Sequence, residues 1–299
     1  MAPSDPAGGE SALRAADIAD AQALVEQAGW NQVAADWRIF LELGAVHARR
    51  DAGGRVVATA ATLPHAGGFA WISMVLVDAA YRRQGWAKQL MQRCLDDLAA
   101  ANRVPVLDAT PAGREVYRQL GFRDSWTYQR LARPARRSAA PPPGRGLEIR
   151  PIDDSLWNAL CAYDAAAFGS PRGPLLSRLR GRLPAAGLCA LREGRLAGFM
   201  LGRDGRLAAH IGPLLAEDDA VAQALLAHAL AAIPGPVFLD FADAQDEVGR
   251  WLAQAGVTPA RPLTRMRLGR DGRFDDPRRT YAVVGPEFGL CLAPARFPC

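Results

Sequence analysis

The sequence predicts an α/β protein with a mixed (α+β) sheet, built as two similar domains in tandem. Segments with the β-branched content of strands alternate with segments that show the i, i+3, i+4 spacing of amphipathic helices. The same order of segments returns after a stretch rich in proline and arginine at 132–146, which we interpret as a linker. A repeat on this scale indicates an internal duplication of a whole domain.

The composition narrows the classes of function. The chain has 299 residues, enough for two cores. No apolar run approaches the ~20 residues of a membrane span, and the N-terminus lacks the regions of a signal peptide, so we expect a cytoplasmic protein with no membrane partner. The five cysteines are scattered and the four histidines lack ligand spacing, which predicts free thiols and no metal. The net charge of +5 comes from dispersed arginines, so nucleic acid is not an expected partner.

The first domain is predicted at 13–131, after a disordered N-terminus at 1–12. Its strands and helices follow from the change in hydrophobic period, and glycine-rich sequences mark its turns. The predicted elements are helices at 13–28 and 34–43, strands at 45–50 and 55–62 joined by a hairpin turn at 51–54, a strand at 71–77, a helix from 87, a strand at 104–109, a helix from 110 to 121 and a strand at 126–131.

The stretch from Trp71 to Ala101 organises this domain. A buried strand ends at Val77, and a short loop with Arg82, Arg83 and Gly85 leads into a helix. Free backbone N–H groups, the positive end of the helix dipole and two fixed cations therefore meet where the helix begins. Such a volume suits a pyrophosphate.

Two motifs of the first domain resemble those of the GNAT N-acetyltransferases. The order Arg82-x-x-Gly85-x-Ala87 is similar to the acyl-CoA signature of that family, R/Q-x-x-G-x-G/A, and Tyr117 stands in a Y-x-x-L-G-F sequence. The predicted order of helices and strands is also the GNAT order. The resemblance therefore implies two GNAT-like (acyl-CoA N-acyltransferase) domains in tandem.

More specifically, the whole chain resembles tandem GNAT proteins whose catalytic first domain precedes a divergent, YitH-like second domain. The features that match are Gly29-Trp30-Asn31 with Asp36-Trp37, the run from Leu107 to Gly113, Ile211-Gly212-Pro213-Leu214, Arg265-Met266 and the segment from Tyr281 to Leu290.

The resemblance implies acetyl-CoA as co-substrate, without a metal. Backbone groups of Val75, Leu76 and Val77 would bind pantetheine and the thioester oxygen, and Tyr117 would be the acid that protonates the sulfur. The other residues expected to bind the cofactor are Arg82, Arg83, Gln84, Gly85, Trp86, Ala87, Lys88, Thr110 and Gly113.

The base and the acceptor site are less well defined, because the strand at 71–77 contains no acid. Asp108, at the end of the next strand, is a candidate catalytic residue, and the alternative is a residue that bonds the following turn. Asn31 and Asp36 are candidates for binding the acceptor, although Asp36 could instead cap the second helix. Arg172 and the 281–290 segment are candidates to face the acceptor cleft from the second domain, unless that domain is purely structural or forms a homodimer.

The second domain, predicted at 147–299, repeats the elements but not the site. Its hairpin is expected at 188–201, its central strand at 207–215, its helix at 220–232 and its next strand at 237–240. At the loop before the helix it has Glu217, Asp218 and Asp219 in place of the arginines. Acidic side chains suit a helix N-terminus but repel a pyrophosphate, so we predict a capped helix that does not bind CoA.

The leading hypothesis is an acetyl-CoA-dependent N-acetyltransferase with one active site in the first domain. Its acceptor would be a primary amine, on a small molecule or a protein, that attacks directly in a ternary complex. The alternative is a non-catalytic acyl-CoA-binding sensor or interaction protein. The missing strand acid favours the alternative, whereas Tyr117 favours the enzyme.

Overall fold

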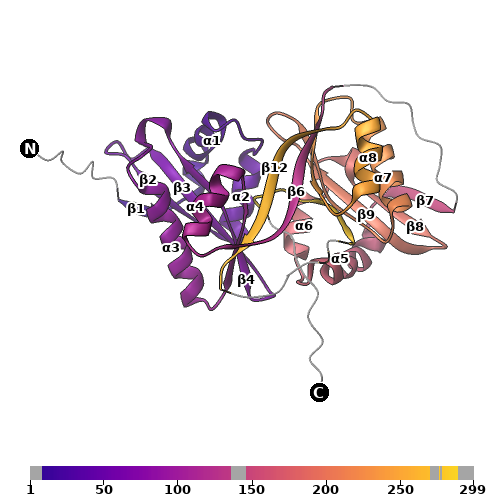
Figure 1. The fold of residues 1–299 in the computed structure, drawn as a ribbon, viewed down its shortest axis with the longest axis horizontal. Helices are drawn as coiled ribbons and strands as arrows, with labels where there is room; N and C mark the ends of the chain where they lie inside the picture. Colours follow the sequence, from indigo (N-terminus) through magenta and orange to yellow (C-terminus); the bar gives the residue numbers. More distant parts are fainter. Residues whose placement is uncertain (1–8, 136–145, 270–275, 277, 289–299) are drawn as a thin grey trace, which may run out of the picture. The chain divides into compact units, whose positions relative to one another are not determined.

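The structure is a computed structural model that describes residues 9–135, 146–269, 276 and 278–288 (Figure 1). The described residues group into two compact units, one within 1–64 and 68–106, the other within 65–67 and 107–299. None of the helices in these ranges is long and apolar enough to cross a membrane. The boundary between the units falls inside a strand. The two compact units therefore differ from the two duplicated domains predicted at 13–131 and 147–299. Those domain limits stay a prediction.

The first unit begins with a strand where the sequence indicates disorder. Glu10–Ala12 forms β1, which pairs antiparallel with β2 from Glu10 opposite Arg49 to Ala12 opposite His47. Main-chain hydrogen bonds hold the two strands together. A strand of three residues is too short for an alternating pattern to be recognised in the sequence. The rest of the predicted disordered N-terminus, residues 1–8, lies outside the described residues.

The other elements of the first unit agree closely with the expected order. Strands follow the order β1-β2-β3-β4-β5, with β2 and β3 antiparallel and β4 and β5 parallel. The elements are η1 (Ala15–Asp17), α1 (Ile18–Gln27), α2 (Ala34–Leu43), β2 (Ala45–Arg50), β3 (Val56–His65), β4 (Phe69–Val77), η2 (Ala79–Tyr81), α3 (Trp86–Ala100) and β5 (Val104–Ala109), the strand in which the boundary between the units falls.

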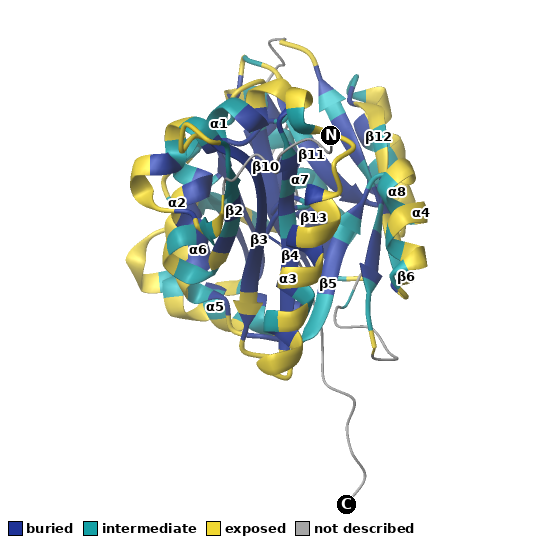
Figure 2. Ribbon diagram, turned by 90° about the vertical axis from the view of Figure 1, so that its left-hand side faces the viewer, coloured by how far each residue is buried: buried dark blue, intermediate teal, exposed yellow. Residues whose placement is uncertain are grey.

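The core of the first unit lies between its sheet and its helices. Figure 2 shows the strands buried along most of their length, whereas the helices are buried on one side. Trp37, Phe40 and Trp71 are fully buried, and α3 buries Leu90 and Cys94 on the apolar stripe expected from its spacing.

The second unit contains the remaining elements. It has strands in the order β12-β6-β11-β13-β10-β9-β8-β7, with an additional pairing of β10 and β11. The elements are α4 (Pro111–Gln119), β6 (Arg123–Arg133), β7 (Leu147–Pro151), α5 (Asp154–Phe168), α6 (Gly173–Leu179), η3 (Pro184–Ala186), β8 (Leu188–Arg192), β9 (Arg195–Arg203), β10 (Ala209–Ala216), α7 (Asp219–Ala232), β11 (Val237–Ala242), α8 (Asp246–Gln254), β12 (Thr258–Arg267) and β13 (Thr280–Val283).

The duplication is visible in these elements, but the last strands of the copies are exchanged. β6 belongs to the first copy by sequence, yet it pairs antiparallel with β11 and β12 of the second copy. Arg130 of β6 and Arg265 of β12 occupy the same position in the two copies when counted from the matched segments 117–122 and 252–257.

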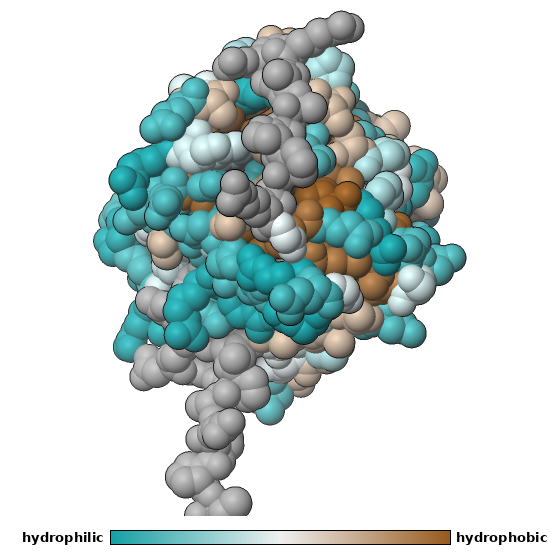
Figure 3. Space-filling view, turned by 90° about the vertical axis from the view of Figure 1, so that its right-hand side faces the viewer, coloured by the Kyte–Doolittle hydropathy of each residue, from teal (hydrophilic) through white to brown (hydrophobic). Residues whose placement is uncertain are grey.

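Large apolar side chains are rare on the surface. Val116 and Leu207 are the exposed ones among the residues that the structure describes. On the face shown in Figure 3, hydrophilic residues border a hydrophobic area near the middle.

Candidate active site

The central strand of the first unit, β4, loses its neighbour partway along. β4 and β5 pair in parallel only as far as Trp71 opposite Val106. Met74 then has a φ of 51°, which is rare for a residue with a side chain, and its carbonyl accepts a 2.8 Å hydrogen bond from the Thr59 hydroxyl. Within the described part of the chain, β4 has no strand neighbours besides β3 and β5. The main chain of 72–77 is therefore left without a strand partner on its β5 side.

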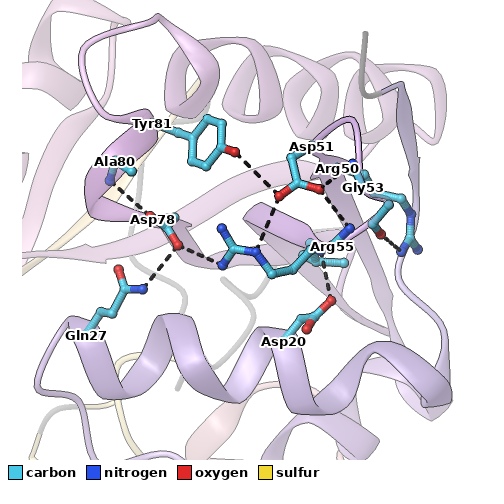
Figure 4. A network of polar contacts seen from close by, with 11 residues as sticks. Asp20, Gln27, Arg50, Asp51, Gly53, Arg55, Asp78, Ala80 and Tyr81 are labelled. Atoms are coloured by element: carbon cyan, nitrogen blue, oxygen red, sulfur yellow. Dashed lines mark hydrogen bonds and ion pairs between the residues drawn. The ribbon is translucent and has the colours of Figure 1, made fainter. Parts of the chain in front are cut away.

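The loop after β4 is fixed at its start by the buried Asp78. One oxygen of its carboxylate accepts the N–H of Ala80 at 2.9 Å (Figure 4). The other accepts hydrogen bonds from Gln27 at 3.1 Å and Arg55 at 2.9 Å. Burial raises the pKa of Asp78, but these three hydrogen bonds outweigh burial and lower it below the ordinary value. The ionised Asp78 thus ties the loop to α1 and to the start of β3.

Aromatic stacking fixes the other end of the loop. The rings of Tyr81 and Trp86 stack with centroids 5.0 Å apart, and the Arg49 guanidinium lies 5.1 Å from the centroid of the Trp86 ring. The Tyr81 hydroxyl lies 3.4 Å from a carboxylate oxygen of Asp51 (Figure 4). The exposed arch at 82–85 is therefore held between two anchored ends.

The main chain from Arg83 to Lys88 forms an open group of hydrogen-bond donors. Arg83 and Gly85 both have positive φ, 63° and 82°, and α3 begins at Trp86. The N–H groups of 83–88 donate to no residue that the structure describes; the helical ladder starts with Gln89 N–H on the Gly85 carbonyl, at 3.0 Å. These donors and the helix dipole favour an anion at this position.

Charge and space around these donors favour the same ligand. Arg82, Arg83 and Lys88 are exposed, and the segment 79–88 contains no acid. A Cβ placed on Gly85 would meet only the side-chain amide of Gln89, at 4.0 Å. The space in front of the glycine is therefore open, and the residues fit a pyrophosphate.

Tyr117, in the second unit, lies on a helix whose start is capped by Thr110. The Thr110 hydroxyl accepts the N–H of Gly113 at 3.2 Å, and a Cβ on Gly113 would come within 3.2 Å of the Tyr117 ring. The ring also contacts Phe122, with centroids 5.9 Å apart. The Tyr117 hydroxyl makes no hydrogen bond to the described residues. Burial raises its pKa, so the phenol carries its proton at neutral pH.

The corresponding loop of the second copy is filled by its own side chains. Asp218 caps α7 by accepting the N–H of Val221 at 3.0 Å, as the capped-helix interpretation predicts. Burial raises the pKa of Asp218, but Arg192 and the cap hydrogen bond lower it below the ordinary value. Arg192 also pairs with Glu217. The positive end of the α7 dipole is thus neutralised by a carboxylate of the same chain, whereas the start of α3 in the first copy has no such acid.

Family models decide the wider identity. Models of the acetyltransferase (GNAT) domain match residues 42–124 and, separately, residues 160–282. The chain belongs to the GNAT acetyltransferases, with two domains in tandem. The uncharacterised N-acetyltransferase YitH of Bacillus subtilis (strain 168) is 25% identical over 171 residues, which cover 56% of this chain and 59% of YitH. The chain thus matches about three-fifths of the length of this curated relative.

Solved structures show the same fold as this GNAT chain. A protein of Pyrococcus horikoshii described as a candidate acetyltransferase aligns over 94% of this chain and 95% of its own, with a TM-score of 0.75 and 20% identity. A GCN5-related N-acetyltransferase of Sphaerobacter thermophilus gives 0.65 at 18% identity, over 87% and 94%. The tandem GNAT protein from the clavulanic acid biosynthesis pathway gives 0.64 at 15%, over 88% and 99%. At these identities the likeness concerns the fold alone.

Within this GNAT fold Asp108 is committed to a buried pair. The Arg265 guanidinium donates to both oxygens of its carboxylate, each at 2.8 Å. Burial raises the pKa of Asp108, and Arg265 opposes that rise. A carboxylate held on both oxygens is poorly placed to take a proton from an amine, so the geometry favours a structural role for Asp108. Its catalytic role stays a prediction.

The residues expected at the acceptor site are buried in their own units. Asp36 accepts the N–H of Val33 at 2.9 Å, in agreement with the capping alternative, and Asn31 is 1% exposed. Arg172 donates to both oxygens of Asp164 at 2.8 and 2.7 Å. The pair suits a structural role for Arg172, and its role at the acceptor site stays a prediction. Of the 281–290 segment, residues 289 and 290 lie outside the described residues.

Sequence reasoning missed the residues that hold the site in place. Asp78 anchors the loop, and Met74 kinks the strand before it. An aspartate directly after a buried strand is a signal for Asp78, because such a position is where a short turn needs an acceptor for its N–H groups. Nothing in the local sequence marks Met74. In the described residues no group of three or more potential metal ligands is found.

Proposed function

We propose that this GNAT protein transfers the acetyl group of acetyl-CoA to a primary amine by direct attack in a ternary complex, with one active site in the first copy. One observation carries the proposal. A strand that has lost its partner leads directly into a run of free N–H groups with exposed cations at 82–88. The unpaired strand edge suits pantetheine, an extended chain that carries amides. The free N–H groups and the cations suit the pyrophosphate.

The proposed binding mode uses main chain more than side chains. The N–H groups of 83–88 receive the pyrophosphate, with Arg82, Arg83 and Lys88 beside it, and each charge-assisted hydrogen bond contributes about 1.5–3 kcal/mol. The backbone of 75–77 pairs with pantetheine and directs an N–H at the thioester oxygen. Such a preorganised donor lowers the barrier by about 3–4 kcal/mol.

The proposed chemistry is a single acyl transfer. The lone pair of the amine attacks the thioester carbonyl, a C–N bond forms and the C–S bond breaks. The sulfur leaves as a thiolate and takes the proton of Tyr117, the nitrogen loses its proton to solvent, and the Tyr117 phenolate then regains a proton from solvent. Tyr117 suits this role because its hydroxyl has no partner in the described chain and burial keeps it protonated.

The rest of the proposal follows the duplication. The catalytic GNAT domain comprises 13–131, a linker 132–146 and the divergent domain 147–299; residues 136–145 lie outside the described residues. Asn31 and Asp36 are the proposed contacts of the acceptor amine, which belongs to a small molecule or a protein. Thr110 and Gly113 shape the start of the helix that carries Tyr117. A cytoplasmic location and a homodimer stay predictions.

A second candidate function is a non-catalytic acyl-CoA sensor. The observation in its favour is that β4 has no acid and that Asp108 is held by Arg265 on both oxygens. Turnover would then lack a residue that accepts the proton of an ammonium ion. A sensor would bind acetyl-CoA without consuming it.

Acetyl-CoA consumption measured against a panel of amines separates the two functions. The panel contains polyamines, amino-acid derivatives, aminoglycosides and lysine peptides, and the product is identified by mass. If the protein is an enzyme, the release of CoA thiol should depend on one class of amine. The rate of release should fall in a Tyr117→Phe variant. Binding of acetyl-CoA by calorimetry without release for any amine would leave the sensor, and no binding would refute both.

A further inference from the structure

The central strands separate at the same point in both copies. In the first copy β4 and β5 are paired over three positions, up to Trp71 opposite Val106. In the second copy β10 and β11 are also paired in parallel over three positions, up to Ile211 opposite Leu239. In each copy the central strand therefore runs on beyond its pairing with the next strand, and we call this unpaired edge the gap. The two gaps differ in whether another strand pairs with that edge.

In the second copy the gap is filled by β13 from the same chain. Ala282 stands opposite Leu214 of β10 and opposite Phe241 of β11, so β13 pairs with both walls of the gap. The Ala216 N–H also donates to the Arg279 carbonyl at 3.2 Å, just before β13. An extended piece of backbone therefore takes the hydrogen bonds that diverging strands leave open.

Side chains at both ends hold this segment in place. The Tyr281 hydroxyl donates to Asp219, in the first turn of α7, at 2.6 Å. Glu287, four residues after β13, forms a buried ion pair with Arg203 of β9. The Arg203 guanidinium also lies 5.5 Å from the centroid of the Phe288 ring. The segment 280–288 thus lies along the gap and ends in a buried pair.

The sequence of β10 is adapted to this close approach. A Cβ on Gly212 would lie 1.9 Å from the Val283 carbonyl oxygen, and Gly212 has a φ of 152°. Any other residue there would push β13 out of the gap. This requirement gives the Ile211-Gly212-Pro213-Leu214 motif a physical role.

We infer that β13 is a built-in occupant of the second copy, lying where the first copy leaves its gap open for the pantetheine arm. Pantetheine, with its two amides, resembles a short extended peptide, so a peptide strand is a fitting substitute. The second copy is then closed to acyl-CoA by its own backbone, in addition to the carboxylates at α7. The part about the first copy rests on the proposed function, whereas the part about β13 does not.

Hydrogen–deuterium exchange of the full-length chain tests the inference. We compare a peptide covering 280–284 with one covering 73–78, with and without saturating acetyl-CoA. The amides of 280–284 should exchange slowly without ligand and should not change when acetyl-CoA is added. The amides of 73–78 should contain a faster class that slows at least tenfold with ligand.

The outcomes separate the inference from the proposed function. Fast exchange of 280–284 without ligand, or slowing of this peptide by acetyl-CoA, overturns the inference. If 280–284 is slow and unchanged while 73–78 ignores acetyl-CoA, the proposed function fails and the occupancy by β13 stands.

Two sets of variants sharpen the test. Gly212→Ala should speed exchange of 280–284 strongly, and Tyr281→Phe, a milder change that keeps the ring, should speed it about tenfold; no effect in either folded variant overturns the inference. Glu217→Gln with Asp218→Asn removes two charges and keeps β13. It should leave one acetyl-CoA bound per chain by calorimetry, because backbone closes the gap. Two acetyl-CoA molecules bound per chain would show that the carboxylates alone exclude acetyl-CoA from the second copy, and this would overturn the inference.

Discussion

Gly85 allows a test that separates the fold of the loop from its proposed ligand. The residue has a φ of 82°, so Gly85→Ala forces an alanine into the left-handed region. Nothing clashes with the new methyl group, because its nearest neighbour is the Gln89 amide at 4.0 Å. The structural cost is therefore backbone strain alone, about 1–2 kcal/mol.

The functional cost is larger if a phosphate rests on these N–H groups. A hydrogen bond from N–H to a phosphate oxygen needs the two atoms about 2.9 Å apart, and a methyl group in the open space keeps the phosphate from that distance. Loss of one charge-assisted hydrogen bond costs about 1.5–3 kcal/mol. The dissociation constant for acetyl-CoA should then rise between about tenfold and about a hundredfold.

Gly54→Ala is the matched control. Gly54 has nearly the same φ, 83°, with nothing within 4 Å of the position that a Cβ would take, and it lies in the β2–β3 hairpin of the same unit. Both variants should lose the same stability in urea titrations, and only Gly85→Ala should lose affinity for acetyl-CoA in calorimetry. Equal affinities in the two variants would refute the placement of the phosphate.

Three further predictions rest on single groups. Tyr117→Phe should lower kcat by about 10²–10⁴-fold without loss of stability, since its hydroxyl has no partner in the described chain; an unchanged kcat would remove it as the acid. Asp240→Asn should cost about 3–5 kcal/mol in urea unfolding, because it leaves the buried Arg130 unpaired, whereas the half-exposed Asp124→Asn should cost under about 1 kcal/mol. Asp78 has a lowered pKa when folded, so its contribution is complete above the ordinary carboxyl pKa near 3.8 and is lost as pH falls below it. Asp78→Asn should therefore flatten the acid limb of stability against pH, and an unchanged slope would contradict this.

Helices and strands were predictable where the hydrophobic pattern of a short segment is enough to define them. The helix at 34–43 and the strands at 45–50 and 104–109 have the limits expected from their patterns. The partners of a strand were not predictable in this way. An alternating pattern indicates that a strand is half-buried, but it does not indicate which strand lies beside it. The pairing of β6 with β11 and the entry of β13 between β10 and β11 were therefore not foreseen.

The candidate site shows the same division. The run from Arg82 to Ala87 follows from a short motif, since free N–H groups, glycine and cations are neighbours in the sequence. The role of Asp108 depends on Arg265, which is 157 residues away in the chain. No local pattern links the two, so a catalytic and a structural role for Asp108 were equally compatible with the sequence.

Two buried aspartate–arginine pairs join the exchanged strands to the two copies. Asp108 of the first copy pairs with Arg265 of the second, and Asp240 of the second copy pairs with Arg130 of the first. Because the two arginines occupy the same position in their copies, the exchange of last strands is reciprocal, and each pair fixes one half of it. Asp108 stands two residues before Thr110, the cap of the helix that carries Tyr117. We therefore expect Arg265 of the second copy to help position the proposed acid, Tyr117, through Asp108 and the start of this helix.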